Sequence, residues 1–197
     1  MCIISSYEER AVLALRELGI PISFVTQGLR PLHEECDDLV SIGLDMFERE
    51  QQLERTTASQ WQAMRLAADR DGIVLAIVSA FRSFDYQRQI IARKLAAGLS
   101  IEQIISVSAL PGFSEHHTGR AVDVGTPGCP PVTEAFEQTQ AFSWLTRRGR
   151  DFGFRMSYSR GNKFGVIYEP WHWVFDGAPP NKTVERTGAP RCGPDAT

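Results

Sequence analysis

Apolar residues recur at helical spacing in several segments of the chain, and these segments start or stop at residues typical of helix ends. Ser83 and Ser100 can each cap a helix, Gly19 and Gly98 follow two of the segments, and residues 57–60 have the form of a capping box. The pattern predicts helices over residues 7–18, 57–72, 84–97, a short stretch from 100, and 133–152. A weaker pattern favours one more helix over residues 36–48.

The remaining apolar segments are typical of strands. Residues 73–81 are apolar and rich in β-branched side chains, which predicts a central strand buried on both faces. Residues 119–125 predict a second strand. Two further runs, 154–159 and 164–169, flank a Gly-Asn pair and predict a hairpin. Since helices come first and hairpin strands last, the predicted fold class is α+β, a mostly antiparallel sheet flanked by helices.

Composition and charge exclude several classes of function. The chain has 197 residues and a net charge of −3, so it carries no basic footprint for nucleic acid or anionic lipid. The longest apolar run, residues 72–81, is shorter than the roughly 18 to 20 residues of a membrane span. The N-terminus has no basic stretch before an apolar one, so we expect no secretory signal and a cytoplasmic protein.

The four cysteines are scattered without a CxxC pair, which favours free thiols over a disulfide framework or a cysteine zinc site. No repeat or internal symmetry is visible, and we expect a monomer.

Two segments hold histidines close to carboxylates. His116 lies seven residues before Asp123, and Glu169 lies three residues before His172. A catalytic zinc needs three nitrogen or oxygen ligands and leaves a fourth position for water. His116, Asp123 and His172 supply such a set, and Glu169 is then left as a general base.

Each of these residues also has a structural interpretation. A histidine beside a tryptophan can pack in a core, Asp123 can cap a turn, and Glu169 can belong to a surface ion pair. Spacing alone does not choose between His116 and its neighbour His117 as a ligand.

Arg82 directly follows the predicted buried strand, so its guanidinium would be held near the end of the sheet. Its five donors in a fixed geometry suit an oxyanion or a carboxylate. The alternative is a surface arginine that pairs with Asp85.

Three motifs together resemble a known family. Residues 114–123 match the S-x-H-x-x-G-x-A-x-D signature of zinc D-Ala-D-Ala carboxypeptidases, and residues 169–173 match their E-x-x-H segment. Residues 79–83, followed by Gln87, are similar to their S-G-Y-R-S-x-x-x-Q stretch, although Ala80-Phe81 stands where Gly-Tyr is common. The resemblance is to the VanY and LdcB branch of murein peptidases, which has the Hedgehog/DD-peptidase fold, and it runs from about residue 57 to 175.

The resemblance implies a role for each matching residue. His116, Asp123 and His172 would hold one Zn²⁺ per chain, Glu169 would be the catalytic base, and Arg82 would stabilise the scissile carbonyl. The motif thereby selects His116 over His117. Two further residues would lie near the terminal carboxylate of the substrate, namely Ser114 and Gln87.

The implied function is removal of a terminal D-alanine from peptidoglycan stem peptides or muropeptides, as a D,D- or L,D-carboxypeptidase. Such a substrate lies in the cell wall, which contrasts with the absence of a predicted signal. The expected organisation is a helical N-terminal extension over residues 1–50, a zinc carboxypeptidase domain over 51–176 and a loose tail over 177–197.

Three alternatives remain open at this point. An L-Ala-D-Glu murein endopeptidase, as in prophage endolysins, would keep the fold and change the bond. A non-catalytic zinc-binding module, as in Hedgehog domains, would need neither Glu169 nor Arg82. A non-haem iron oxygenase also uses two histidines and a carboxylate, but its all-β barrel conflicts with the predicted helices.

Overall fold

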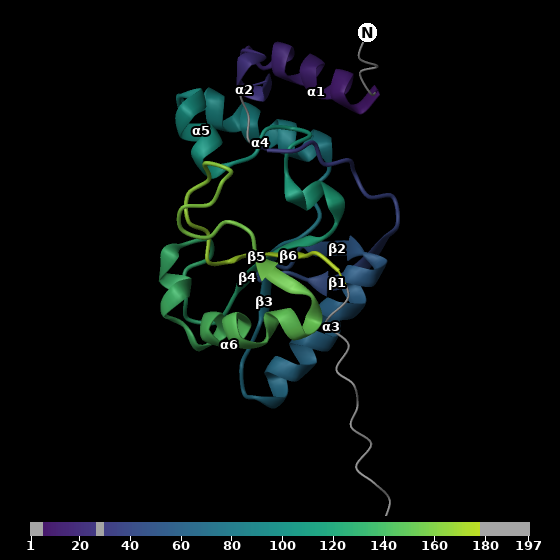
Figure 1. Ribbon diagram of the computed structural model, residues 1–197, viewed down its shortest axis with the longest axis vertical. Coiled ribbons are helices and arrows are strands. Elements are labelled where there is room, and N and C mark those ends of the chain that lie inside the picture. Colours follow the sequence, from purple (N-terminus) through teal and green to yellow (C-terminus); the bar gives the residue numbers. More distant parts are fainter. Residues whose placement is uncertain (1–5, 27–29, 178–197) are drawn as a thin grey trace, which may run out of the picture.

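The chain folds into helical layers on the two sides of a small sheet. A computed structural model describes residues 6–26 and 30–177, and most of the tail predicted from residue 177 lies outside them. Figure 1 shows α1, α2, α4 and α5 above the strands and α3 and α6 below them. The fold is α+β with antiparallel sheets, as predicted.

The helices largely follow the apolar pattern. Ser83 and Ser100 cap α4 and α5, and each hydroxyl accepts a backbone N–H three residues ahead. The Glu54 carboxylate caps α3 instead of Thr57, so this helix begins before the predicted capping box. The helices are α1 (Ser6–Glu17), α2 (Ser23–Thr26), α3 (Arg55–Arg70), α4 (Phe84–Ala96), α5 (Ile101–Val107) and α6 (Gln140–Arg148), with 3₁₀ turns η1 (Glu115–Thr118), η2 (Glu134–Gln138) and η3 (Gly149–Phe152).

The strands form one four-stranded and one two-stranded sheet. The larger has the order β3-β4-β6-β5, and β1 pairs with β2, in every case antiparallel. The strands are β1 (Leu39–Leu44), β2 (Glu50–Glu54), β3 (Ala76–Ser79), β4 (Ala121–Gly125), β5 (Phe154–Met156) and β6 (His172–Phe175).

The prediction that residues 73–81 form a central strand is wrong, because β3 lies at the edge of its sheet. Its apolar composition has another reason. The β1–β2 hairpin covers this edge, where the Met46 N–H donates to the Ile77 carbonyl at 2.9 Å. Arg49 Nη2 also donates to the Val78 carbonyl at 3.1 Å.

Two more predictions are wrong. Residues 36–48 contain strand β1 instead of a helix. Val40 and Ile42 are two residues apart, so in a strand both side chains point to the same face, where they pack against the core cluster. Residues 164–169 are not a strand, and β5 pairs with β6. A turn does form at Gly161-Asn162, and the Asn162 amide then donates to the Ser159 and Val166 carbonyls, which replaces strand pairing by a compact loop.

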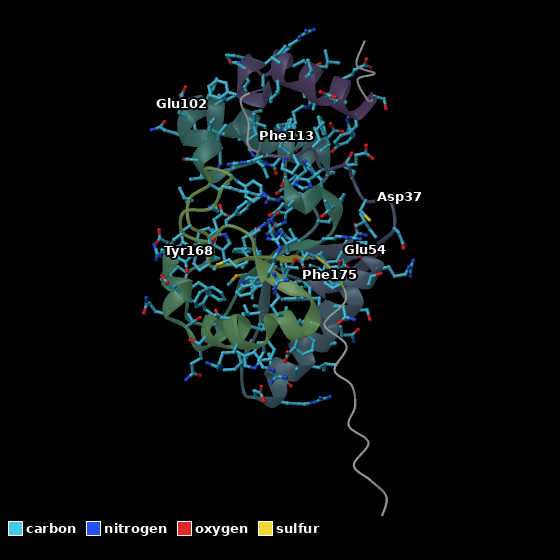
Figure 2. The ribbon with its side chains drawn as sticks, in the orientation of Figure 1. Asp37, Glu54, Glu102, Phe113, Tyr168 and Phe175 are labelled. Carbon is cyan, nitrogen blue, oxygen red and sulfur yellow. The ribbon has the colours of Figure 1, made fainter. Side chains whose placement is uncertain are left out.

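The buried apolar side chains form two separate hydrophobic clusters. One, which includes Phe175, packs the sheet against α3 and α6, and the other, which includes Phe113, joins α1, α4 and α5 (Figure 2). Since Val122 and Trp173 belong to the first cluster, their strand neighbours Asp123 and His172 face away from it. In the described part of the chain, no helix has the length and apolar character to cross a bilayer.

Candidate metal centre

The sheet register places two of the candidate ligands opposite each other. Asp123 on β4 pairs with His172 on β6, so both side chains project from the same face. The turn η1 brings His116 to the same point. One ligand atom from each of the three lies within 4.8 Å of the others, and all three residues are buried.

The hydrogen bonds of His116 leave one ring nitrogen free. Nδ1 lies 2.5 Å from the Ala80 carbonyl oxygen, which can only accept, so Nδ1 carries the proton. Nε2 is buried without a hydrogen-bond partner and lies 3.3 Å from Asp123 Oδ2. Burial and the nearby Arg82 lower the pKa of His116 to about 4, because together they outweigh the opposing effect of Asp123. The ring is therefore neutral, and the lone pair on Nε2 is available to a metal ion.

His172 lies between two carboxylates. Its Nδ1 is 2.9 Å from Asp123 Oδ1, and its Nε2 is 2.8 Å from Glu115 Oε2, which also accepts the Ser157 hydroxyl at 2.7 Å. Burial lowers the pKa of His172, but the two carboxylates outweigh this effect and raise it to about 10. A metal ion at this site would take the place of the proton on Nδ1, while Glu115 would keep the ring oriented through Nε2.

Glu169 lies beside the cluster without belonging to it. Its backbone N–H donates to the Tyr158 carbonyl at 3.0 Å, and its own carbonyl accepts the His172 N–H at 3.1 Å. Burial raises the pKa of its carboxyl to about 7; His172 opposes this rise, whereas Asp123 adds to it. A carboxyl with a pKa near neutrality can both take up and release a proton, as a general acid or base requires.

Arg82 lines the same pocket as the cluster and Glu169. Its backbone N–H donates to the His116 carbonyl at 3.2 Å, and its Nε is buried without a hydrogen-bond partner. The guanidinium makes no ion pair with Asp85; among the described residues, Asp85 pairs with Arg10 and Arg88. Arg82 is thus free to contact a ligand.

These side chains share one pocket of about 370 Å³. It is lined by the cluster, Glu169 and Arg82, and also by Ser114, whose side chain is almost fully buried. Gln87 is not among the lining residues. Its Nε2 donates to the Ala109 carbonyl at 2.7 Å, and the residue is fully buried.

His117 lies outside the metal cluster. Its Nε2 accepts the Gly112 N–H at 3.1 Å, so Nδ1 must be the nitrogen that donates to the Arg82 carbonyl at 2.6 Å. With both ring nitrogens engaged, His117 ties the backbone of Arg82 to that of Gly112.

Sequence reasoning missed four residues of the site. Glu115 holds His172, and the Tyr158 ring stacks on the His172 ring with centroids 4.6 Å apart. Two cations, Arg30 and Lys94, line the pocket. Glu115 had a visible signal, since it is a carboxylate next to a candidate ligand. The others lie in segments without a motif.

Comparison with known proteins agrees with this geometry. The family model described as "VanY: D-alanyl-D-alanine carboxypeptidase" matches residues 50–178. The chain belongs to this family. The match contains the whole His-Asp-His cluster together with Glu169 and Arg82.

Individual relatives are similar over part of their length. The chain is 31% identical over 163 residues to YodJ of Bacillus subtilis (strain 168), covering 79% of this chain and 59% of that protein. It is 30% identical over 121 residues to a D-alanyl-D-alanine carboxypeptidase of Enterococcus faecalis, and the match covers 56% of this chain and 43% of that protein. The chain therefore spans about half the length of these curated relatives.

Solved structures share the fold. The LdcB LD-carboxypeptidase superposes with a TM-score of 0.66 at 29% identity, over 74% of this chain and 71% of that one. VanYB, solved in complex with D-alanine-D-alanine, superposes with a TM-score of 0.57 at 23% identity, over 76% of this chain and 82% of that one.

Proposed function

We propose that the chain is a zinc-dependent carboxypeptidase that removes a terminal D-alanine from peptidoglycan stem peptides. The observation that carries this proposal is the buried His-Asp-His cluster in one pocket with a carboxyl of raised pKa and with Arg82, whose buried Nε has no hydrogen-bond partner in the described part of the chain. Membership of the VanY family supports the substrate class.

The residues present fit a zinc ion. Two imidazole nitrogens and one carboxylate oxygen are the ligand types of catalytic zinc sites, and His116 Nε2 is a buried acceptor without a partner. His116, Asp123 and His172 would hold the ion, with Glu115 behind His172. When bound, zinc would polarise the scissile carbonyl and make a water molecule more acidic.

Glu169 supplies the proton transfers. Because its carboxyl has a pKa of about 7, it is partly ionised near neutral pH and can accept a proton from water. It can then donate this proton to the amine of the departing D-alanine. Arg82, whose Nε lacks a partner, would donate to the carbonyl oxygen as negative charge develops there.

The test is mass spectrometry of defined tetrapeptide and pentapeptide muropeptides after incubation with the zinc-loaded protein. Loss of one D-alanine from either peptide is the expected result, and the peptide that reacts distinguishes L,D from D,D specificity. Cleavage between L-alanine and D-glutamate instead would make the chain an endopeptidase.

Two variants test the assigned roles. Glu169→Gln should lower turnover by about 10² to 10⁴-fold or more, because the proton acceptor is lost. Arg82→Ala should lower it by about 10² to 10³-fold. Both variants should still bind one equivalent of zinc, and Glu102→Gln, at an exposed glutamate of α5, serves as the control. A Glu169→Gln protein that trims muropeptides at the parent rate would exclude this mechanism.

A further inference from the structure

Two cations of the pocket wall have no part in the proposed chemistry. Lys94 lies in the last turn of α4, and Arg30 lies before β1, outside the part of the chain that the family model matches. Both line the pocket that holds the His-Asp-His cluster. We call these two residues the cationic wall.

Neither residue of the cationic wall pairs with a carboxylate among residues 6–26 and 30–177. Arg30 Nη2 donates to the Ile105 carbonyl at 2.6 Å, and Lys94 Nζ donates to the Ser108 hydroxyl at 2.5 Å. Both side chains are half-buried, and burial lowers the pKa of each. Glu169 acts in the opposite direction on both cations, but burial outweighs it, so a further anion in the pocket would stabilise them.

The acidic groups of the pocket are already engaged. Asp123 contacts His116 and His172, and Glu169 is the proposed proton acceptor. Lys94 lines the same pocket as Arg82, Glu169 and the His-Asp-His cluster. An anion held by Lys94 would therefore lie in the pocket that receives the scissile peptide bond.

A carboxypeptidase substrate always carries such an anion, the free carboxylate of its last residue. The family resemblance places Ser114 and Gln87 near this carboxylate. Ser114 lines the pocket but carries no charge, and Gln87 is fully buried, does not line the pocket and donates to the Ala109 carbonyl. The Lys94 ammonium has three donors, of which Ser108 takes one. Two donors remain for a ligand in the pocket.

We propose that the cationic wall, with Lys94 as its main contact, binds the C-terminal carboxylate of the substrate and so restricts the enzyme to the last peptide bond. This inference rests on the proposed carboxypeptidase function. Arg30 adds the second positive charge and fixes α5 through the Ile105 carbonyl.

The experiment compares two substrates that differ only at this carboxylate. An N-acetylated stem peptide that ends in D-alanine and the same peptide with a terminal carboxamide are each given to the zinc-loaded protein. The parent should prefer the acid. In Lys94→Met, kcat/KM for the acid should fall by roughly 10- to 100-fold, as expected for one charge-assisted hydrogen bond. The loss should appear mainly in KM, because the carboxylate is bound equally in ground and transition states.

The controls separate charge from structure. Activity on the amide should be nearly the same in Lys94→Met and the parent, and Lys94→Arg should recover most of the preference for the acid. Arg30→Met should change the preference in the same direction as Lys94→Met. Arg93→Met, which removes an exposed cation from the same turn of α4, should leave it unchanged.

Two negative results have different meanings. If the parent releases no D-alanine, the proposed function is wrong. A different result would exclude only the cationic wall. If the parent releases D-alanine but the ratio of kcat/KM for the acid to kcat/KM for the amide is the same in Lys94→Met as in the parent, then the cationic wall does not bind the carboxylate.

Discussion

At the scale of single residues, the site depends on groups that orient the candidate ligands. Glu115 holds His172 Nε2 and is itself held by Ser157, which leaves Nδ1 directed toward the cluster. Burial raises the pKa of the Glu115 carboxyl, but the hydrogen bonds from His172 and Ser157 outweigh it and hold the pKa at about 2. Glu115 is therefore an ionised carboxylate at neutral pH and makes the imidazole a stronger ligand.

Replacing this carboxylate should weaken metal binding. In Glu115→Gln we expect zinc affinity to fall about 10- to 100-fold, the range typical of partners of metal-bound histidines. The measurement is competition with a chelator of known affinity, and Glu102→Gln on exposed α5 is the control (Figure 2). Equal affinities in the parent and Glu115→Gln would show that His172 needs no such partner.

The sequence predicted the three candidate metal ligands better than the residues that surround and orient them. The motif spacing marks His116, Asp123 and His172, and the fold brings these three together. The contact between Glu115 and His172 joins positions 57 residues apart, and no local pattern records it. Arg30 and Lys94 were missed for the same reason, since only the folded chain places them on one pocket.

At the scale of elements, the turn that carries His116 is fitted against the β2–α3 junction. Gly119 ends η1 with φ +65°, in the left-handed region that favours glycine. A Cβ added there would lie 2.7 Å from the backbone nitrogen of Glu54 and 3.1 Å from a methyl carbon of Leu39. The left-handed backbone and the close packing together explain why the motif has glycine at position 119.

Gly119→Ala should therefore be strongly destabilising. We expect a loss of roughly 2 to 4 kcal/mol in the free energy of unfolding, from left-handed strain and overpacking together. Gly161→Ala is the matched control, because Gly161 has φ +69° but nothing within 4 Å of an added Cβ, and it should lose only about 1 to 2 kcal/mol. Urea denaturation of both variants measures the difference, and equal losses would mean that close packing at Gly119 is unimportant.

Element prediction succeeded where capping residues marked the ends and failed where pairing decided the structure. Ser83 and Ser100 fix the starts of α4 and α5 through local hydrogen bonds, which a sequence displays directly. Strand β1 depends on its pairing with β2, and the loop over residues 157–171 is fixed both by the local bonds of Asn162 and by a distant one, from the Ile167 N–H to the Ser106 carbonyl. The short apolar runs there fit more than one structure, so the helix at 36–48 and the strand at 164–169 were wrong.

At the scale of the whole molecule, residues that precede the family match contribute to the pocket and to the packing around it. The family match begins at residue 50, yet α1 packs with α4 and α5 in the second cluster, and Arg30 reaches the pocket. Residues that line the pocket come from α4 and α5 of this upper helical layer and from strands β4 and β6 of the sheet. Figure 1 shows these helices above the strands. In the cationic wall, Lys94 comes from α4 and Arg30 from the segment before β1, whereas the metal cluster comes from the sheet and η1.

Because the ligands come from η1, β4 and β6, metal binding should stabilise the entire fold. The site exists only when the chain is folded, so free zinc at about 100 times its dissociation constant should add about 2.7 kcal/mol to the free energy of unfolding. For a chain of this size, that corresponds to a rise in Tm of roughly 5 to 10 °C.

Thermal unfolding at a series of buffered zinc concentrations measures this linkage. Mg²⁺ at the same concentrations should produce no comparable shift, because it prefers oxygen ligands to the two imidazoles of this cluster. His116→Ala removes one ligand and the hydrogen bond to the Ala80 carbonyl, so its Tm without metal should be lower and its dependence on zinc should largely disappear. If His116→Ala instead gained as many degrees from zinc as the parent, the stabilising ion would bind elsewhere, and the His-Asp-His cluster would lose its assignment as the metal centre.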